Sequence, residues 1–437
     1  MKKIAYIMMI FLGVSAIVGT SCSRNVFDID TYDSLIEIKS PVDTVDPNHT
    51  WTLSSSRYII VSMNAEVGAK KLQILTADPV TSSAATILTQ RTVTEGDRFS
   101  MNVSVPSYLS TLYAALVDGD GKYTVTRVSS SERDIDFSSP LYKSQTVSHT
   151  PLNHYYAFCF EQEFPEPGDY DYNDVILHIA MEHSAADEIK FHVRLAAVGA
   201  DKALAGCLRF PDMTMEDIDT VYTEGDKSFN KDQSGTEIPK QNRSVTTNTD
   251  LLLEGRSGEP ILNLFVDAHW ATGEIQAKDT YGIFNRKKYN VSYGSSTTTQ
   301  EYPPREITYV VKFKDASRLN YLTMEDIDPF LMRYYGNAIM EIHTYKYRKD
   351  NALKEFKYVD VEHLPWALVI PIGEFFHPLD GVNIGFRMKS EYTQGVEVLY
   401  GAYATSGHSF GEWSVNRNKA TDWYLQEYAS SGQVFVW

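Results

Sequence analysis

Hydrophobic residues recur along this chain in short runs that alternate with polar turns. Between residues 51 and 138 these runs are rich in Val, Ile, Tyr and Thr, and Gly, Ser and Asp separate them. Four of the runs are Tyr58–Val61, Lys71–Leu75, Phe99–Val103 and Thr111–Val117. Apolar runs of this length, bounded by turn residues, predict an N-terminal antiparallel β-sandwich over residues 51–138.

A second series of strand-like runs extends from residue 150 to residue 437. It includes Val175–Ile179, Ile189–Leu195, Ile261–Val266 and Ile307–Val311, and long polar stretches separate some of them. We therefore expect a larger β-rich domain over residues 150–437, with long loops and few short helices. The whole chain is predicted to be mainly β.

The start of the chain has the pattern of a secretion signal. Two lysines precede an apolar run at residues 4–18, and Gly19-Thr20-Ser21 leads to Cys22. The run is shorter than the about 20 residues of a membrane-spanning helix, so we expect residues 1–21 to be a cleaved signal peptide. Small residues directly before a cysteine resemble the lipobox of bacterial lipoproteins, which implies lipidation of Cys22. An ordinary signal peptide followed by a chance cysteine is the alternative.

The expected location is the outer membrane, with the protein facing the periplasm or the cell surface, and residues 22–50 are expected to form a polar tether. The chain carries 57 acidic and 40 basic residues, a net charge of −17. So acidic a chain is an unfavourable partner for nucleic acid, whereas acidic loops suit calcium. Cys159 and Cys207 lie in apolar runs and are expected as buried strand cysteines, with a disulfide as the alternative.

One short motif occurs twice. Thr214–Asp219 and Thr323–Asp328 share the sequence Thr-Met-Glu-Asp-Ile-Asp. A threonine followed three residues later by an acid resembles a capping box, in which the two side chains close the first turn of a helix. A capped short helix is therefore predicted at each copy, in preference to a metal site.

The densest cluster of oxygen donors is Gly168-Asp169-Tyr170-Asp171-Tyr172-Asn173-Asp174. Alternating Asp169, Asp171 and Asn173 could direct three side-chain oxygens at one cation, as in the first half of an EF-hand. The sixth position of that pattern is Asp174 instead of glycine, and the twelfth is Ala180, so the loop is not an EF-hand.

A calcium loop of a β protein remains the favoured interpretation of this cluster. Glu161 or Glu163 could complete the shell from the preceding turn. A metal is favoured because crowded carboxylates repel one another unless a cation compensates them. The predicted calcium ligands are Asp169, Asp171, Asn173, Asp174 and Glu161. The alternative is an aspartate-rich turn whose side chains bond to backbone amides.

The same cluster is part of a resemblance to a known family. Phe160–Pro165 and Gly168–Val175 resemble the entry motif of the LruC-type domain of bacterial outer-membrane lipoproteins. The closing motifs of that domain resemble Leu364–Pro371, then Phe410 and Trp413, then Asp422–Tyr424, in the same order. Gln162, Glu163 and Phe164 depart from the family pattern. The resemblance covers about residues 155–437 and implies an envelope location and a binding role, with no established activity.

Two functional hypotheses follow. The first is a non-enzymatic, lipid-anchored envelope protein that binds or adheres to a glycan, a host protein or an envelope partner. The second is a carbohydrate-active hydrolase with two paired carboxylates, although the sequence does not select the pair. Gly407–Gly411 fits the G-x-S-x-G pattern of serine hydrolases, but no histidine follows His408, so Ser409 is expected in a structural loop.

Overall fold

The fold is known from a computed structural model. It describes residues 42, 44–63, 68–94, 96–137, 143–231, 252–256, 258–272, 288–292, 304–335, 338–347, 359–360, 363–388 and 394–437. The predicted signal peptide and Cys22 lie outside these residues. No helix within the described ranges combines the length and the apolar character needed to cross a membrane.

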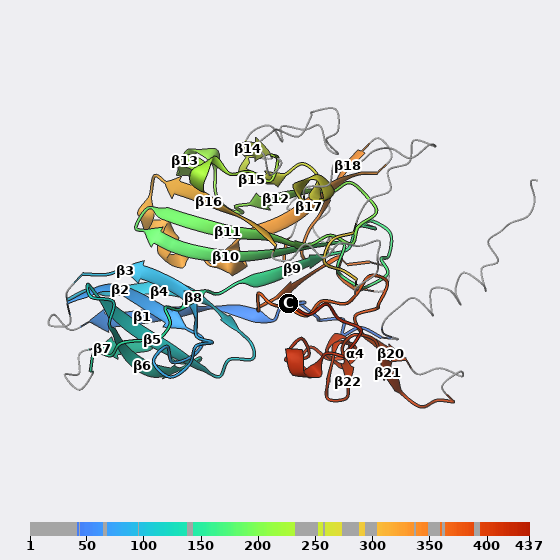
Figure 1. The fold of residues 1–437 in the computed structure, drawn as a ribbon, viewed down its shortest axis with the longest axis horizontal. Coiled ribbons are helices and arrows are strands. Elements are labelled where there is room, and N and C mark those ends of the chain that lie inside the picture. Colours follow the sequence, from blue (N-terminus) through green and yellow to red (C-terminus); the bar gives the residue numbers. More distant parts are fainter. Residues whose placement is uncertain are drawn as a thin grey trace, which may run out of the picture.

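Two sheets form the N-terminal part, which lies at the lower left of Figure 1. The three-stranded sheet has the order β4-β1-β7 and contains β1 (Ser54–Met63), β4 (Arg98–Pro106) and β7 (Asp134–Phe137). The five-stranded sheet has the order β6-β5-β2-β3-β8 and contains β2 (Ala69–Leu75), β3 (Thr86–Thr92), β5 (Thr111–Asp118), β6 (Tyr123–Ser129) and β8 (Leu152–Asn153). Alternate residues such as Val61, Leu72 and Val103 share one core because successive strand side chains point to opposite faces.

The larger β region also has two sheets, in which neighbouring strands are antiparallel. The six-stranded sheet has the order β13-β16-β11-β10-β9-β19 and contains β9 (Tyr156–Phe160), β10 (Val175–Ala185), β11 (Glu188–Ala197), β13 (Ile218–Thr223), β16 (Arg305–Phe313) and β19 (Ala367–Ile370). The five-stranded sheet has the order β14-β15-β12-β17-β18 and contains β12 (Ala205–Arg209), β14 (Leu253–Arg256), β15 (Glu259–Phe265), β17 (Asp328–Tyr335) and β18 (Ala338–Ile342). Phe191 of the first sheet and Leu264 of the second belong to one core, and the prediction of a mainly β fold is confirmed.

The six-stranded sheet is buried on both faces at strand β9. Tyr156, Phe158 and Phe160 point into the core between the two sheets, whereas Ala157 and Cys159 belong to a second core on the opposite face. Strands covered on both faces need apolar residues at every position, which explains the uninterrupted apolar sequence of β9. Cys159 is therefore buried as expected, and Cys207 of β12 is buried as well.

The C-terminal segment contributes a group of large aromatic residues to this second core. Trp413 and Trp423 pack with their ring centroids 5.8 Å apart. The short elements of this segment are β20 (Phe386–Met388), β21 (Val398–Tyr400), β22 (Ala404–Thr405), β23 (His408–Ser409), α4 (Phe410–Val415) and η6 (Gln426–Tyr428). The last residue, Trp437, packs on His178 of β10, with their ring centroids 5.1 Å apart.

The expected polar tether differs from the structure at its end. Val42, Val45 and His49 are buried against the C-terminal segment instead of being solvated. The His49 Nε2–H donates to the carbonyl of Trp413 (3.0 Å), while its Nδ1 accepts from the Trp51 amide. Burial lowers the pKa of His49 to about 4, so the ring is neutral. Apolar and aromatic partners in the C-terminal segment are the reason that these three side chains are buried.

The remaining short helices are η1 (Met215–Asp217), η2 (Glu224–Asp226), α3 (Ala268–Ala271), η4 (Ala316–Tyr321) and η5 (Met324–Asp326). Both copies of the repeated motif form capped 3-10 turns, η1 and η5, each with a complete capping box. That prediction is confirmed.

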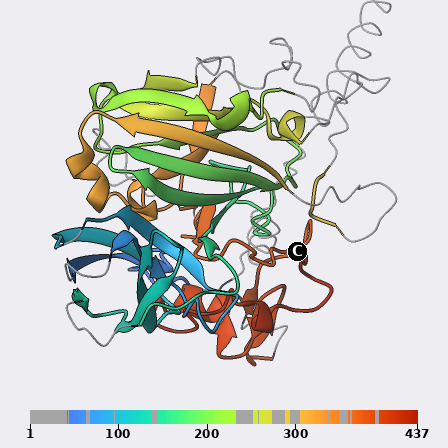
Figure 2. The same ribbon diagram turned by 60° about the vertical axis from the view of Figure 1, so that its left-hand side comes forward.

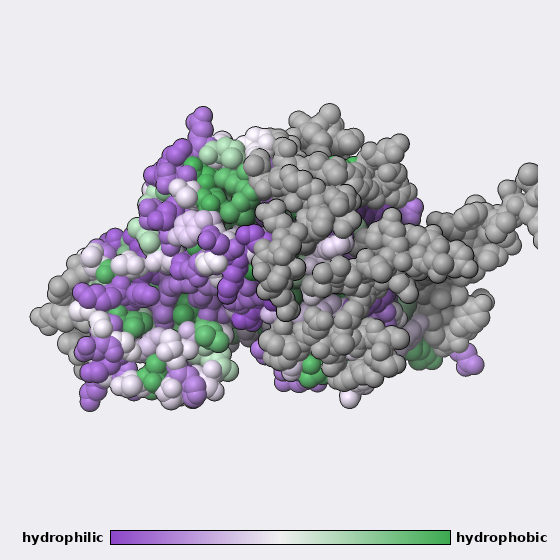
Figure 3. Space-filling view, turned by 45° about the horizontal axis from the view of Figure 1, so that its top comes forward, coloured by the Kyte–Doolittle hydropathy of each residue, from purple (hydrophilic) through white to green (hydrophobic). Residues whose placement is uncertain are grey.

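The N-terminal sandwich packs against the larger β region along β3 and β10, as Figure 2 shows. Gln90 of β3 donates to Glu182 of β10 (3.0 Å), and the Tyr156 hydroxyl donates to Ser104 Oγ (2.9 Å). On the described surface seen in Figure 3, hydrophilic residues predominate and apolar residues occur in small groups. This surface agrees with the 22% of charged residues in the chain.

Candidate metal centre

The acidic cluster lies in the loop that joins β9 to β10. These strands are antiparallel neighbours, and Phe160 pairs with Val175 at the point where the loop begins and ends. Glu161 and Asp174 are the next residues on either side of this pair. The register therefore brings two acids that are 13 positions apart in sequence together at the ends of the loop.

Four side chains of the loop converge, namely those of Glu161, Glu163, Asp169 and Asp174. One carboxylate oxygen from each lies within 4.8 Å of the other three. Calcium binds oxygen at about 2.3–2.6 Å, so ligands on opposite sides of the ion are about 5 Å apart. The spacing of the four carboxylates therefore fits calcium.

Two of these carboxylates are enclosed, since Glu161 is 1% and Asp174 4% exposed. Glu161 Oε1 accepts from the Tyr172 amide (2.6 Å), and Asp174 Oδ2 accepts from the Gln162 amide (2.7 Å). Glu161 Oε2 is buried without a hydrogen-bond partner, and so is Glu163 Oε2. Buried oxygens of this kind are costly unless a ligand satisfies them.

The electrostatics of the group disfavour four charged carboxylates side by side. Burial, followed by the repulsion of Asp171 and Asp174, raises the pKa of Glu161 well above its usual range. Burial and then Glu163 raise the pKa of Asp174 in the same direction. Lys202 contacts the group through Glu163 (3.2 Å). A single ammonium cannot balance four carboxylates, whereas a divalent cation would make their charged forms favourable.

Asp171 and Asn173, also predicted as ligands, have a different role in the structure. Asp171 accepts from the amides of Asn173 (3.1 Å) and Gly381 (2.8 Å), and Asn173 Nδ2 donates to the Pro378 carbonyl (3.1 Å). Burial and then Asp169 raise the pKa of Asp171 to about 8. These two residues bond to backbone, as in the aspartate-turn alternative, and fasten the loop to residues 378–381. Glu163, which the sequence left as an alternative to Glu161, joins the group beside it.

Two tyrosines give the loop its shape. Tyr170 and Tyr172 have left-handed backbone conformations, with φ of 59° and 50°. Such conformations cost on the order of 1 kcal/mol or more for a residue with a side chain. Both rings are buried, and their hydroxyls donate to Asp360 Oδ2 (2.7 Å) and the Pro365 carbonyl (2.9 Å). Burial of the rings offsets the strained turn that places Asp169 and Asp174 on one side.

Gly168 permits the closest approach within the loop. A Cβ atom at this position would lie 2.1 Å from Glu161 Oε2. No side chain could occupy that space without displacing the buried carboxylate. The oxygen that lacks a partner is therefore held against bare backbone.

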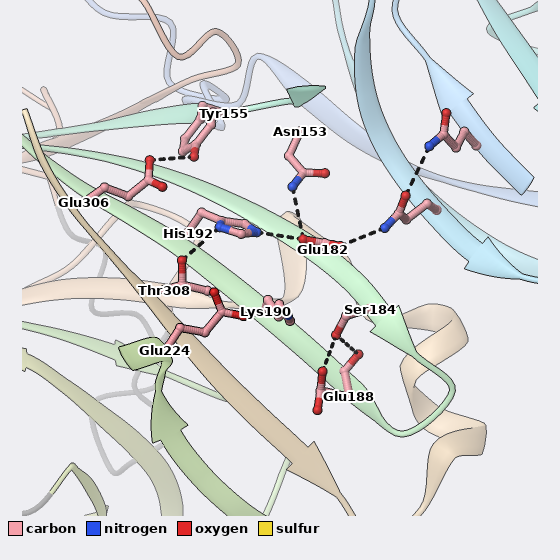
Figure 4. Close-up of polar contacts among 12 residues, drawn as sticks. Asn153, Tyr155, Glu182, Ser184, Glu188, Lys190, His192, Glu224, Glu306 and Thr308 are labelled. Carbon is pink, nitrogen blue, oxygen red and sulfur yellow. Dashed lines mark hydrogen bonds and ion pairs between the residues drawn. The ribbon is translucent and has the colours of Figure 1, made fainter. Parts of the chain in front are cut away.

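Glu182 and Glu306 of the six-stranded sheet have basic partners, as Figure 4 shows for Glu182 and His192. Glu182 Oε2 lies 2.9 Å from His192 Nε2, and Glu306 lies 2.5 Å from Arg194. The Tyr155 hydroxyl also donates to Glu306 (2.9 Å). These carboxyls differ from the loop carboxyls in the direction of their pKa. The hydrogen bond with His192 lowers the pKa of Glu182, and the hydrogen bond and charge of Arg194 outweigh burial and lower the pKa of Glu306.

Ser409, from the G-x-S-x-G pattern, is a helix cap. Its hydroxyl accepts from the Glu412 amide (3.1 Å) and donates to Glu412 Oε2 (2.7 Å) at the start of α4. The side chain is fully buried. These hydrogen bonds give Ser409 a structural role as the cap of α4.

Comparison with known proteins places the fold among uncharacterised domains. A crystal structure of a "putative lipoprotein" from Bacteroides ovatus has a similar fold, with a TM-score of 0.53 and 15% sequence identity over 84% of this chain and 100% of that chain. No curated protein matches the sequence. Residues 185–413 match the family described as "Domain of unknown function (DUF4842)", whereas the resemblance to LruC-type domains stays a prediction. Because the family match spans more than half of the sequence, the chain belongs to the DUF4842 family.

Proposed function

We propose that this protein is a lipid-anchored envelope protein with a calcium-stabilised β region and a binding role. Its ligand would be a glycan, a host protein or an envelope partner. The sequence around Cys22 supports the lipid anchor. The "putative lipoprotein" of similar fold is in keeping with it.

The buried, unpartnered Glu161 oxygen within the group of four carboxylates is the observation that carries the calcium proposal. Glu161, Glu163, Asp169 and Asp174 would bind the ion. Asp171 and Asn173 would position the loop through residues 378–381. Calcium bound here would link β9 and β10 to the C-terminal segment and so stabilise the larger β region.

The surroundings of the carboxylates favour binding over catalysis. A glycoside hydrolase needs two carboxylates on either side of a cleft, with the pKa of one raised. In this chain Glu161 and Asp174 have a raised pKa but are enclosed by the loop. Glu182 and Glu306 are more accessible but have basic partners.

Calorimetric calcium titration of the chain from Ser23 onward tests the cation site. The wild type is expected to bind one equivalent of calcium and to unfold at a higher temperature in its presence, since about 2.7 kcal/mol is gained at a hundredfold excess over Kd. Glu161→Gln combined with Asp174→Asn should abolish both effects, because these changes retain the shapes and remove the charges.

Asp120→Asn is the matched control for this titration. Asp120 lies in an exposed acidic turn of the N-terminal sandwich, and this variant should bind calcium like the wild type. Equal calcium responses in the wild type and the double variant would refute the site. Magnesium is the comparison ion, because its shorter bonds of about 2.1 Å demand a tighter group of ligands.

The lipid anchor has a separate test. In a Gram-negative host fed labelled palmitate, the full chain should incorporate label and fractionate with membranes. Cys22→Ser should lose the label and become soluble, because a thioether-linked lipid needs the cysteine sulfur. Equal labelling of the two proteins would contradict lipidation of Cys22.

A further inference from the structure

A two-stranded hairpin of the C-terminal segment lies beside the point where the N-terminal segment joins the fold. Strands β20 and β21 are antiparallel partners, and Figure 1 shows them at the lower right of the molecule. Val42, the first described residue, forms a parallel bridge with Arg387 of β20. The chain that leads from Cys22 therefore joins the described fold at the edge of β20 that β21 does not occupy.

The two faces of this hairpin have different surroundings. Arg387 points toward α4, because a Cβ at Gly411 of that helix would lie 2.5 Å from the Arg387 Cβ. Phe386 and its partner Tyr400 are one position away from Arg387 and its partner, so they point to the opposite face. Val398 shares the face of Tyr400, since it is two positions away on the same strand.

The face that points away from α4 exposes aromatic and apolar side chains. Tyr400 is 41% exposed and packs on the half-buried Phe386, with ring centroids 4.8 Å apart and 25° between the rings. Val396, just before β21, is 64% exposed, and Val398 is half-buried. We call Phe386, Val396, Val398 and Tyr400 the hairpin face. Exposed apolar groups that lie together on a polar surface mark sites of interaction.

The charged groups described in the hairpin strands and beside them compensate each other. The Arg387 guanidinium lies 2.6 Å from Glu397 Oε2. The chain as a whole has a net charge of −17, which opposes contact with anionic lipid headgroups. Burial of apolar side chains in a bilayer interface does not need lipid charge. The hairpin face therefore suits a lipid surface of zwitterionic or uncharged headgroups.

The place where the tether joins the fold gives this surface its partner. From Cys22 to Val42 there are 20 residue steps, which span at most about 70 Å even when fully extended. A lipid on Cys22 would bring the β20 end of the molecule to the bilayer first. Contact between the hairpin face and the bilayer then becomes an intramolecular event, so a surface too weak to bind from solution can be engaged.

We propose that the hairpin face rests on the lipid surface to which the protein is anchored. The proposal rests on the proposed lipid anchor and adds a second membrane contact, made by protein side chains. Tyr400 would place its ring at the level of the headgroups, where tyrosine is favoured, with Val396 and Val398 beside it. This contact would turn the β6 and β7 end of the sandwich, on the opposite side of Figure 1, away from the membrane.

A fluorescent reporter on the hairpin tests this contact without using Cys22. The chain from Ser23 onward, with an N-terminal hexahistidine tag, is attached to phosphatidylcholine vesicles that contain a nickel-chelating lipid. Val396→Cys carries the environment-sensitive dye NBD, and Cys159 and Cys207 should not react because they are buried. Attachment should raise the emission by about twofold or more, and lipids with a nitroxide on the acyl chain should quench it.

Substitutions in the labelled protein define the face. Tyr400→Ser should reduce the emission change by about half or more, because it removes the interfacial ring. Tyr400→Trp should retain the change, since tryptophan favours the same level of the bilayer. Tyr222→Ser is the matched control, at a tyrosine of β13 that is 42% exposed, and it should leave the change intact. A label at Asp120→Cys, in an exposed turn of the sandwich, should not respond to vesicles.

Several outcomes would overturn the proposal. They are an unchanged emission at residue 396 on attachment, a change that Tyr400→Ser leaves intact, and a change that requires phosphatidylglycerol in the vesicles. An emission that rises with protein concentration in the absence of vesicles would instead assign the hairpin face to a second copy of the chain. Because the nickel lipid replaces the natural anchor, failure of lipidation at Cys22 and failure of the hairpin contact are separate results.

Discussion

At the residue scale, the contact between Gly168 and Glu161 determines the shape of the acidic loop. A Cβ at residue 168 would come within 2.1 Å of Glu161 Oε2 and 2.8 Å of its Cδ. We therefore expect Gly168→Ala to displace the carboxylate, lower the free energy of unfolding by about 1–3 kcal/mol and weaken calcium binding. Urea unfolding and calorimetric titration measure the two effects.

Gly119→Ala is the control for this substitution. The nearest atom to a Cβ at Gly119 is Lys70 Cε at 3.9 Å, so this variant should behave like the wild type. If Gly168→Ala proved as stable and as responsive to calcium as Gly119→Ala, the close packing described for the loop would be wrong.

His343 is a second residue whose surroundings decide its behaviour. Its ring stacks between Phe330 and Tyr347, with centroids 4.7 and 4.0 Å away. Its nitrogens contact Asp328 (2.8 Å) and Glu341 (3.1 Å). Burial lowers the pKa of His343, but the two carboxylates outweigh burial, and the net pKa is raised above its usual value of 6.5.

A raised pKa means that the folded state binds the His343 proton more tightly than the unfolded state. The stabilisation is fully present below pH 6.5 and is lost as the pH rises through the folded-state pKa. His343→Gln should therefore cost on the order of 3 kcal/mol at pH 6 and less at pH 9, measured by urea unfolding. His149→Gln, at an exposed histidine, is the control, and a cost for His343→Gln that grew with pH would contradict this assignment.

At the element scale, the two capped turns offer an internal comparison. Thr323 is buried, accepts from the Glu325 amide (3.2 Å) and donates to Asp326 (2.8 Å). Thr214 makes the equivalent bond to Asp217 (3.0 Å) but is exposed. Removing a capping threonine costs about 0.5–2 kcal/mol, and less where water can replace it.

We therefore expect Thr323→Ala to destabilise the protein by about 1–2 kcal/mol and Thr214→Ala by less than half of that. Chemical unfolding of the two variants side by side measures the difference. An equal loss in both would show that the shared motif, and not its burial, sets the contribution of the cap.

At the scale of the whole molecule, Glu325 connects the N-terminal sandwich to the larger β region. Its Oε1 accepts from Ser54 and Ser104 of the sandwich, and its Oε2 lies 2.5 Å from Lys346. Glu325→Ala would leave these partners without their shared acceptor. We expect it to lower the coupling between the two regions by about 2 kcal/mol.

Differential scanning calorimetry measures this coupling. The heat-capacity peak of Glu325→Ala should broaden or split, because the sandwich and the larger region would unfold less cooperatively. Glu427→Ala, in the C-terminal η6 and far from this contact in sequence, is the control. If Glu325→Ala gave a single peak identical to that of the wild type, Glu325 would not couple the two regions.

Much of the fold follows from local sequence. The parts that do not follow from it have one cause in common, namely contacts between residues that are far apart in the chain. Short apolar runs bounded by turn residues predicted the strands, and the residues Thr-Met-Glu-Asp predicted both capped turns, because these features depend on neighbours in the chain. Strand β8, at residues 152–153, pairs in parallel with β3 although it follows the predicted sandwich. The buried end of the expected tether depends likewise on distant partners, here Trp413.

The sequence by itself determined the mainly β class, the buried cysteines and the position of the acidic loop, since periodicity and residue chemistry are properties of short segments. Only the tertiary structure decided which acids converge. Asp171 and Asn173 turn to backbone at residues 378–381, some 200 residues away, while Glu163 joins Glu161. Contacts between residues far apart in sequence leave no periodic signal, so folding alone reveals them.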